Sequence, residues 1–166
     1  NQMKKKRNQA RRAYPVMIKG YLVKAFIQSL SFDLTTAQAR VSEEILQDMQ
    51  KPAPMGRLVQ GDVGCGKTIV AALSMLGVVE NNFQSVLLAP TEILAEQHYL
   101  NFSKWLEPLN INCVLLIGKL SAKQKRERLE VIAEGKAHII IGTHAVFQKE
   151  VRYKNLALVV IDEQHR

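Results

Sequence analysis

The spacing of hydrophobic positions changes at about residue 56, and this change separates two predicted parts of the chain. Before it, apolar residues recur every three or four positions, which predicts a helix over 17–30 with core positions Ile18, Leu22, Phe26 and Leu30. A second helix is predicted from a cap at Thr35 or Thr36 to about Gln50, with core positions Ala37, Val41, Ile45 and Met49. Pro52, Pro54 and Gly56 end that helix.

After residue 56, short apolar runs alternate with helical patterns. Strands are predicted at 57–60, 85–89, 112–117, 138–141 and 156–161, and helices at about 67–80, 92–105 and 121–134. Strands that alternate with helices indicate right-handed crossovers and a mainly parallel sheet covered by helices on both faces. The predicted fold class is therefore α/β, with an N-terminal helical extension.

Composition is that of an ordinary globular protein, with 47% hydrophobic and 23% charged residues in a length of 166 that suits one domain. No apolar run approaches the roughly 20 residues that span a bilayer. The N-terminus lacks the pattern of a secretory signal, and Cys65 and Cys113 have no metal-ligand spacing. These features predict a cytoplasmic protein with no membrane partner.

The net charge of +8 is concentrated near the N-terminus. Residues 1–32 contain eight Lys or Arg and no Asp or Glu, whereas residues 33–166 contain fifteen of each sign. Residues 1–13 are predicted to form a basic helix that Pro15 interrupts. Such a segment can bind nucleic-acid phosphates, or it can be the solvated face of a helix. The sequence leaves both interpretations open.

A glycine-rich motif follows the first predicted strand. Residues 61–68, Gly-Asp-Val-Gly-Cys-Gly-Lys-Thr, fit the P-loop pattern G-x-x-x-x-G-K-[ST]. Glycines let backbone N–H groups surround phosphate oxygens, and the helix N-terminus favours an anion. Lys67 would supply a charge to the outer phosphates, and the Thr68 hydroxyl could ligate Mg²⁺. The residues predicted to bind ATP here are Gly61, Gly64, Cys65, Gly66, Lys67 and Thr68.

A second motif ends the last predicted strand, where the apolar run 158–161 leads into Asp162 and Glu163. Two carboxylates at the end of a buried strand can lie beside the phosphates of a bound nucleotide. Asp162 would hold Mg²⁺ through water, and Glu163 would orient or deprotonate the attacking water. Lys67, Asp162 and Glu163 are therefore the predicted catalytic residues.

Five segments occur in the order of the superfamily 2 helicase motifs. They are Phe32-x-Leu34-Thr35-x-Ala37-Gln38, the P-loop, the run Ala89–His98, Gly142-Thr143-His144, and Asp162-Glu163-Gln164-His165-Arg166. Over about residues 15–166 the chain resembles the RecG-type ATP-dependent DNA helicases. The resemblance implies a RecA-like domain that uses ATP and Mg²⁺ to move on double-stranded or branched DNA, in replication-fork rescue, recombination and repair. The transcription-repair coupling translocases are similar, although they usually read Asp-Glu-Glu-His in the last motif.

The resemblance also implies roles for four further residues. Gln38 would read adenine, because a side-chain amide can pair with a base edge; a polar surface position is the alternative. Thr91 would bond a DNA phosphate and Thr143 would make a second backbone contact, although an ordinary helix cap would use the same atoms of Thr91. His165 would couple the ATP site to the DNA surface.

The resemblance implies a domain plan as well. Residues 1–31 would be a basic helical linker from an N-terminal wedge domain, and residues 32–166 an incomplete first motor domain that needs a second one. We therefore expect these 166 residues alone to be inactive as a translocase. In this family a later strand would insert between strands 57–60 and 156–161, so we expect an empty slot between them.

Several residues are interpreted differently. Cys65 stands where relatives usually have Ser, but a thiol is small enough for the phosphate cradle. Ile117-Gly118 replaces a common Thr-Gly, so no DNA contact is assigned there. Cys113, Trp105, His98 and the Met residues are interpreted as packing residues. A basic nucleic-acid-binding module with a vestigial nucleotide site remains the alternative function, although the intact Lys67, Thr68, Asp162 and Glu163 argue against it.

Overall fold

The computed structural model describes residues 21–29, 40, 47, 57–61 and 67–162. It contains a five-stranded sheet in the order β1-β5-β2-β4-β3, and each pair of neighbouring strands is parallel. The strands are β1 (Arg57–Gly61), β2 (Gln84–Leu88), β3 (Cys113–Leu116), β4 (Ile139–Gly142) and β5 (Leu156–Asp162). The predicted strands are confirmed, with ends that differ by at most one residue.

The helices are also close to their predicted positions. They are α2 (Tyr21–Ser29), α4 (Lys67–Val79), α5 (Glu92–Leu106) and α6 (Ala122–Ala133). The sequence pattern predicts neither of the two short 3₁₀ helices, η1 (Glu107–Leu109) and η2 (His144–Phe147), because one turn is too short to show a periodicity. Within the part of the chain described, none of the helices has both the length and the apolar character to cross a membrane.

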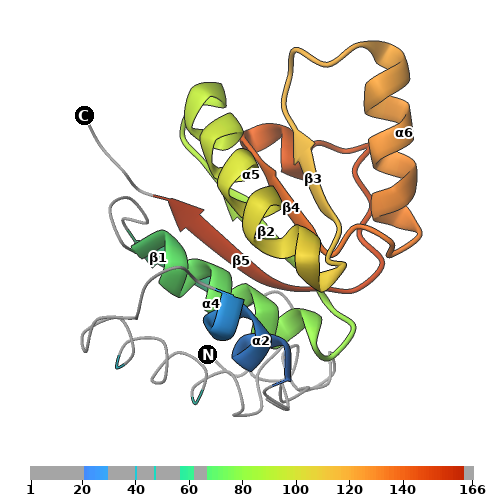
Figure 1. The fold of residues 1–166 in the computed structure, drawn as a ribbon. Coiled ribbons are helices and arrows are strands. Elements are labelled where there is room, and N and C mark those ends of the chain that lie inside the picture. The colour runs from blue at the N-terminus through green and yellow to red at the C-terminus, as the bar shows by residue number, and fades with distance from the viewer. Residues whose placement is uncertain (1–20, 30–39, 41–46, 48–56, 62–66, 163–166) are drawn as a thin grey trace, which may run out of the picture.

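Apolar side chains cover both faces of the sheet, as the predicted fold class requires. On one face, Leu87, Ile141 and Val160 join the buried residues of α4, α5 and α2. On the other face, Val86, Ile140, Val159 and Leu116 pack with Ile132 of α6 and Val146 of η2. Figure 1 shows α4 and α5 beside the sheet, α6 near β3, and α2 against α4. Alternate residues of β2, β3, β4 and β5 therefore contribute to two separate cores.

Helix α2 shares the first of these cores. Phe26 is fully buried, and its ring meets Trp105 of α5 edge-on at a centroid distance of 5.9 Å. Glu80, directly after α4, accepts hydrogen bonds from the backbone N–H groups of Leu22 at 2.8 Å and Val23 at 3.1 Å. A carboxylate from elsewhere in the fold thus satisfies free amides in the first turn of α2. The domain boundary at residue 31 stays a prediction, but α2 packs as part of the α/β domain.

The expected slot between the first and last strands is wrong. β1 and β5 form a regular parallel ladder, from Arg57 opposite Leu158 to Gly61 opposite Asp162. Direct pairing satisfies backbone N–H and C=O groups that a gap would leave without partners, and unpaired buried groups of this kind are costly. The ladder also brings the end of β1 beside the end of β5, which determines the geometry of the candidate site.

Candidate active site

The candidate site lies at the carboxyl edge of the sheet. Because the strands are parallel, their carboxyl ends share one edge, where α/β proteins commonly bind ligands. Gly61, the last residue of β1 and the first of the P-loop, is in register with Asp162, the last residue of β5. The two motifs are about 100 residues apart in the sequence, and the β1–β5 ladder makes them neighbours.

The far end of the P-loop is the start of α4. Lys67 is the first residue of this helix and Thr68 is the second, so both belong to its first turn. The first backbone N–H groups of a helix have no partners within the helix, and the helix dipole favours an anion at this end. The other predicted phosphate-binding residues, Gly64, Cys65 and Gly66, lie outside the described residues.

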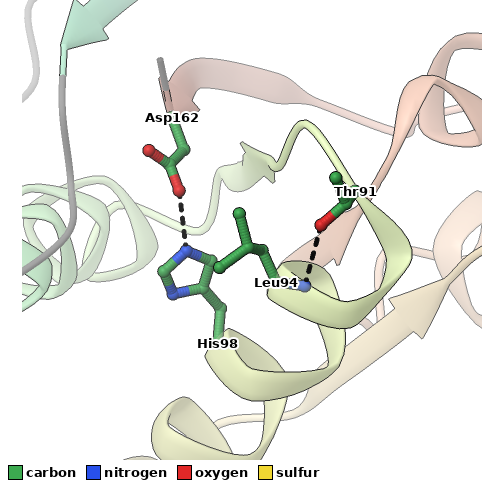
Figure 2. A network of polar contacts seen from close by, with 4 residues as sticks. All are labelled: Thr91, Leu94, His98 and Asp162. Atoms are coloured by element: carbon green, nitrogen blue, oxygen red, sulfur yellow. Dashed lines mark hydrogen bonds and ion pairs between the residues drawn. The ribbon is translucent and has the colours of Figure 1, made fainter. Parts of the chain in front are cut away.

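Of the two predicted carboxylates of the site, Asp162 lies within the described residues. It is buried, with no exposed side-chain area, and its Oδ2 lies 3.0 Å from Nε2 of His98 (Figure 2). Mg²⁺ prefers oxygen ligands and usually takes one or two carboxylates together with phosphates and water. Asp162 lies at the end of β5, beside the strand that leads into the P-loop, and Thr68 lies in the first turn of α4. A carboxylate and a threonine hydroxyl at these positions therefore fit the ligands of a magnesium nucleotide.

Thr91 occupies the N-cap of α5. Its hydroxyl accepts a hydrogen bond from the backbone N–H of Leu94 at 3.2 Å, and its side chain is exposed (Figure 2). Glu92, in the same turn, accepts a hydrogen bond from the backbone N–H of Gly118 at 3.1 Å. A capping hydroxyl still carries its own hydrogen, which it can donate to a phosphate. Capping and DNA contact are thus compatible at Thr91, and the contact stays a prediction.

Thr143 follows β4 and is the N-cap of η2, where its side chain makes no capping hydrogen bond. It is buried, with 6% of its surface exposed. This burial limits access of a DNA phosphate to its hydroxyl. The DNA contact of Thr143 therefore stays a prediction that has less geometric support than that of Thr91.

Three other predicted residues lie outside the described residues. Gln38, Glu163 and His165 belong to this group, so their roles in reading adenine, orienting water and coupling stay predictions.

The residue that sequence reasoning missed is His98. The packing interpretation is correct insofar as His98 is buried in the inner stripe of α5 with Ala95, Phe102 and Leu106. However, its imidazole also contacts the predicted metal carboxylate. The signal was present in the sequence, because a buried polar side chain in an apolar helix stripe needs a polar partner. The sequence could not say which one.

Two further packing interpretations are confirmed. Trp105 packs against the core, with its ring near Phe26 and at a 5.7 Å centroid distance from Phe102. Cys113, at the start of β3, also packs against this core. Burial raises the pKa of its thiol to about 12, against the smaller opposing effect of a hydrogen bond with Ser103. A thiol that stays protonated has little nucleophilic character.

Comparisons with known proteins agree with these observations. Residues 35–166 match the family described as DEAD/DEAH box helicase. The chain is 51% identical over 154 residues to ATP-dependent DNA helicase RecG of Pasteurella multocida (strain Pm70), an alignment that covers 93% of this chain and 22% of the relative. It is 45% identical over 164 residues to RecG of Aquifex aeolicus (strain VF5), covering 99% of this chain and 21% of the relative.

Solved structures give the same result. A structure of RecG bound to a three-way DNA junction matches 99% of this chain and 23% of its own, with a TM-score of 0.84 and 44% identity. The DEAD-box helicase Mss116 bound to ssRNA and UDP-BeF is 17% identical, with a TM-score of 0.60 over 91% of this chain and 39% of its own, and shows a shared fold alone. The resemblance to RecG-type helicases is confirmed, and the chain spans about a fifth of the length of these curated relatives.

Proposed function

Because this chain belongs to the DEAD/DEAH box helicase family, we propose that it is the ATP-binding half of a motor that moves on double-stranded or branched DNA. One observation carries the proposal: the β1–β5 ladder sets Gly61, where the P-loop begins, opposite the buried Asp162. A phosphate-binding loop beside a strand-end carboxylate is the arrangement that phosphoryl transfer from a magnesium nucleotide requires.

Each residue of the site has a proposed task. Backbone N–H groups of residues 61–68 and the Lys67 ammonium bind the phosphates, while Thr68 and Asp162 hold Mg²⁺. The bound metal neutralises charge that develops on the phosphate oxygens. Glu163 orients the attacking water, and Gln38 recognises adenine.

The proposed nucleic-acid partner is branched DNA. A RecG relative that covers this chain almost completely has been solved on a three-way DNA junction, and the other RecG relatives are DNA helicases. In this chain Thr91 and Thr143 would contact the DNA backbone and His165 would couple the two sites. We assign the whole protein to replication-fork rescue, recombination and repair in the cytoplasm. For the 166 residues by themselves we propose nucleotide binding without translocation.

Nucleotide binding can be measured by calorimetry with ATP and Mg²⁺. We expect binding by the wild type and loss of binding in Lys67→Ala, because the variant lacks the phosphate-binding charge. The matched control is Lys119→Ala, which removes an exposed lysine paired with Glu96 at 2.8 Å. Equal heats for the wild type and Lys67→Ala would show that residues 61–68 are not the nucleotide site.

The charge of residues 1–32 favours a second candidate function, nucleic-acid binding by the basic segment itself. Deleting residues 1–13 removes six basic side chains, and we expect the low-salt affinity for DNA to fall together with its salt dependence. Unchanged DNA affinity would identify the segment as a solvated helix. DNA binding that persists in Lys67→Ala would show that the two sites are separate.

A further inference from the structure

The contact between His98 and Asp162 joins a helix to the predicted metal carboxylate. Nε2 of His98 lies 3.0 Å from Oδ2 of Asp162, and the side chains are 7% and 0% exposed, respectively (Figure 2). A carboxylate that ligates a metal ion is ionised and accepts hydrogen bonds without donating them, so in the metal-binding state Nε2 carries the hydrogen of this bond. The direction of the bond is therefore from the imidazole to the carboxylate.

Helix α5 holds the imidazole in place. Ala95, Phe102 and Leu106, on the same stripe as His98, are fully buried. The first turn of the helix is fixed by the Thr91 cap and by the bond between Glu92 and the Gly118 amide. A side chain on a helix fixed at several points has few ways to move, which suits it to orient a neighbouring group.

We propose that His98 is a positioning residue for the Mg²⁺–nucleotide site, and this rests on the function proposed above. Its Nε2–H holds Oδ2 of Asp162 and so fixes the rotamer of this carboxylate at the end of β5. A carboxylate has two oxygens and about four lone-pair positions, so a hydrogen bond at Oδ2 is compatible with metal ligation. Partners of this type are known to orient the ligands of metal ions and to raise metal affinity.

The same helix would connect two sites. Thr91, the predicted DNA contact, precedes His98 by seven residues, which corresponds to about 10 Å along a helix axis. Helix α5 thus carries a predicted phosphate contact at its N-terminus and the partner of the metal carboxylate two turns later. A displacement of α5 would move the imidazole relative to Asp162.

The test is the Mg²⁺ dependence of nucleotide binding by the full-length protein, measured with a fluorescent ATP analogue. His98→Leu removes the donor, and the Mg²⁺ concentration for half-maximal binding should rise roughly 10–100-fold, as is typical when a partner of a metal ligand is lost. Affinity in EDTA should stay unchanged. His98→Gln should restore most of the Mg²⁺ response, because its amide nitrogen can replace Nε2 as donor.

Phe102→Leu is the matched control, because it alters another fully buried residue of α5 that lies next to Trp105. It should lower stability and leave the Mg²⁺ dependence unchanged. If the Leu variant does not fold, His98→Asn takes its place, since its shorter amide cannot reach Oδ2. A wild-type Mg²⁺ response in His98→Leu, or a shift in Phe102→Leu as large as that in His98→Leu, would overturn the proposal.

A second readout needs no nucleotide. In the free protein, the stability effects of His98→Leu and Asp162→Asn should be non-additive, because the two side chains share one hydrogen bond. Additive effects would contradict a direct interaction. The two proposals also fail in different ways: a wild type without Mg²⁺-dependent ATP binding refutes both, whereas normal wild-type binding with an unaffected His98→Leu variant refutes only the role of His98.

Discussion

Gly142, the last residue of β4, lies at a point where β3, β4 and η2 approach one another closely. It pairs with Leu116 of β3, and its own carbonyl accepts a hydrogen bond from the Ala89 N–H at 2.8 Å. A Cβ added at Gly142 would lie 2.0 Å from the Leu116 carbonyl oxygen and 2.7 Å from Cγ1 of Val146. Gly142→Ala therefore cannot be accommodated by rotating one flexible side chain, because the nearest atom belongs to the backbone.

The geometry sets the size of the effect. A Cβ atom essentially never lies within 3.0 Å of a backbone oxygen, and the added Cβ would lie 2.0 Å from the Leu116 carbonyl oxygen. Strands β3 and β4 must therefore separate by about 1 Å. Overpacking of this kind costs about 1–3 kcal/mol, and a weakened ladder hydrogen bond adds about 1 kcal/mol. We expect Gly142→Ala to lower the free energy of unfolding by about 2–4 kcal/mol. For a chain of this size, the melting temperature should fall by about 2–4 °C for each kcal/mol.

Gly118→Ala is the matched control. A Cβ at Gly118 would meet only Oε2 of Glu92, at 3.3 Å, and this atom is the end of a flexible side chain at an exposed site. Its effect should be within about 0.5 kcal/mol of zero, as for most surface substitutions. Urea unfolding followed by circular dichroism measures both variants. Similar losses for the two alanines, or a Gly142→Ala variant as stable as the wild type, would refute the steric argument.

Three further predictions concern polar and ionisable side chains. Glu80→Ala should cost about 3–6 kcal/mol of stability, because Glu80 accepts two hydrogen bonds from the first turn of α2 and a bond to a charged group contributes about 1.5–3 kcal/mol. Glu80→Gln keeps an acceptor and should cost less, and equal losses of the two variants in denaturant melts would contradict this. Iodoacetamide should modify Cys65 and spare Cys113, because burial raises the pKa of the Cys113 thiol to about 12. Saturating ATP should slow the labelling of Cys65. If mass spectrometry shows the same labelling rate with and without ATP, this loop is not the nucleotide site. Burial lowers the pKa of His138, whose Nδ1 accepts a hydrogen bond from the Asn112 N–H at 2.9 Å. The contribution of His138 to stability should therefore be complete above the ordinary histidine pKa of about 6.5 and be lost as the pH falls below it. A His138→Asn variant whose stability has the same pH profile as the wild type would contradict this.

The sequence by itself determined the local structure and the chemistry of this protein. Strand and helix positions are encoded in runs and periods of a few residues, and the observed elements begin and end close to where these patterns do. The start of α6 is another local feature, since Ser121 and Gln124 form a capping box from two side chains three positions apart. The P-loop motif also needs only eight consecutive residues to be recognised.

Only the tertiary structure decided which of these elements meet. The family resemblance predicts a slot between β1 and β5, but the two strands pair directly and place Gly61 opposite Asp162. Likewise, the apolar stripe of α5 predicts that His98 is buried, and only the packing of α5 beside the end of β5 brings Asp162 to its imidazole. Strand order and polar partners depend on contacts between residues that are far apart in the sequence, 64 positions for His98 and Asp162 and 101 for Gly61 and Asp162. The spacing of residues within one segment carries no information about such contacts.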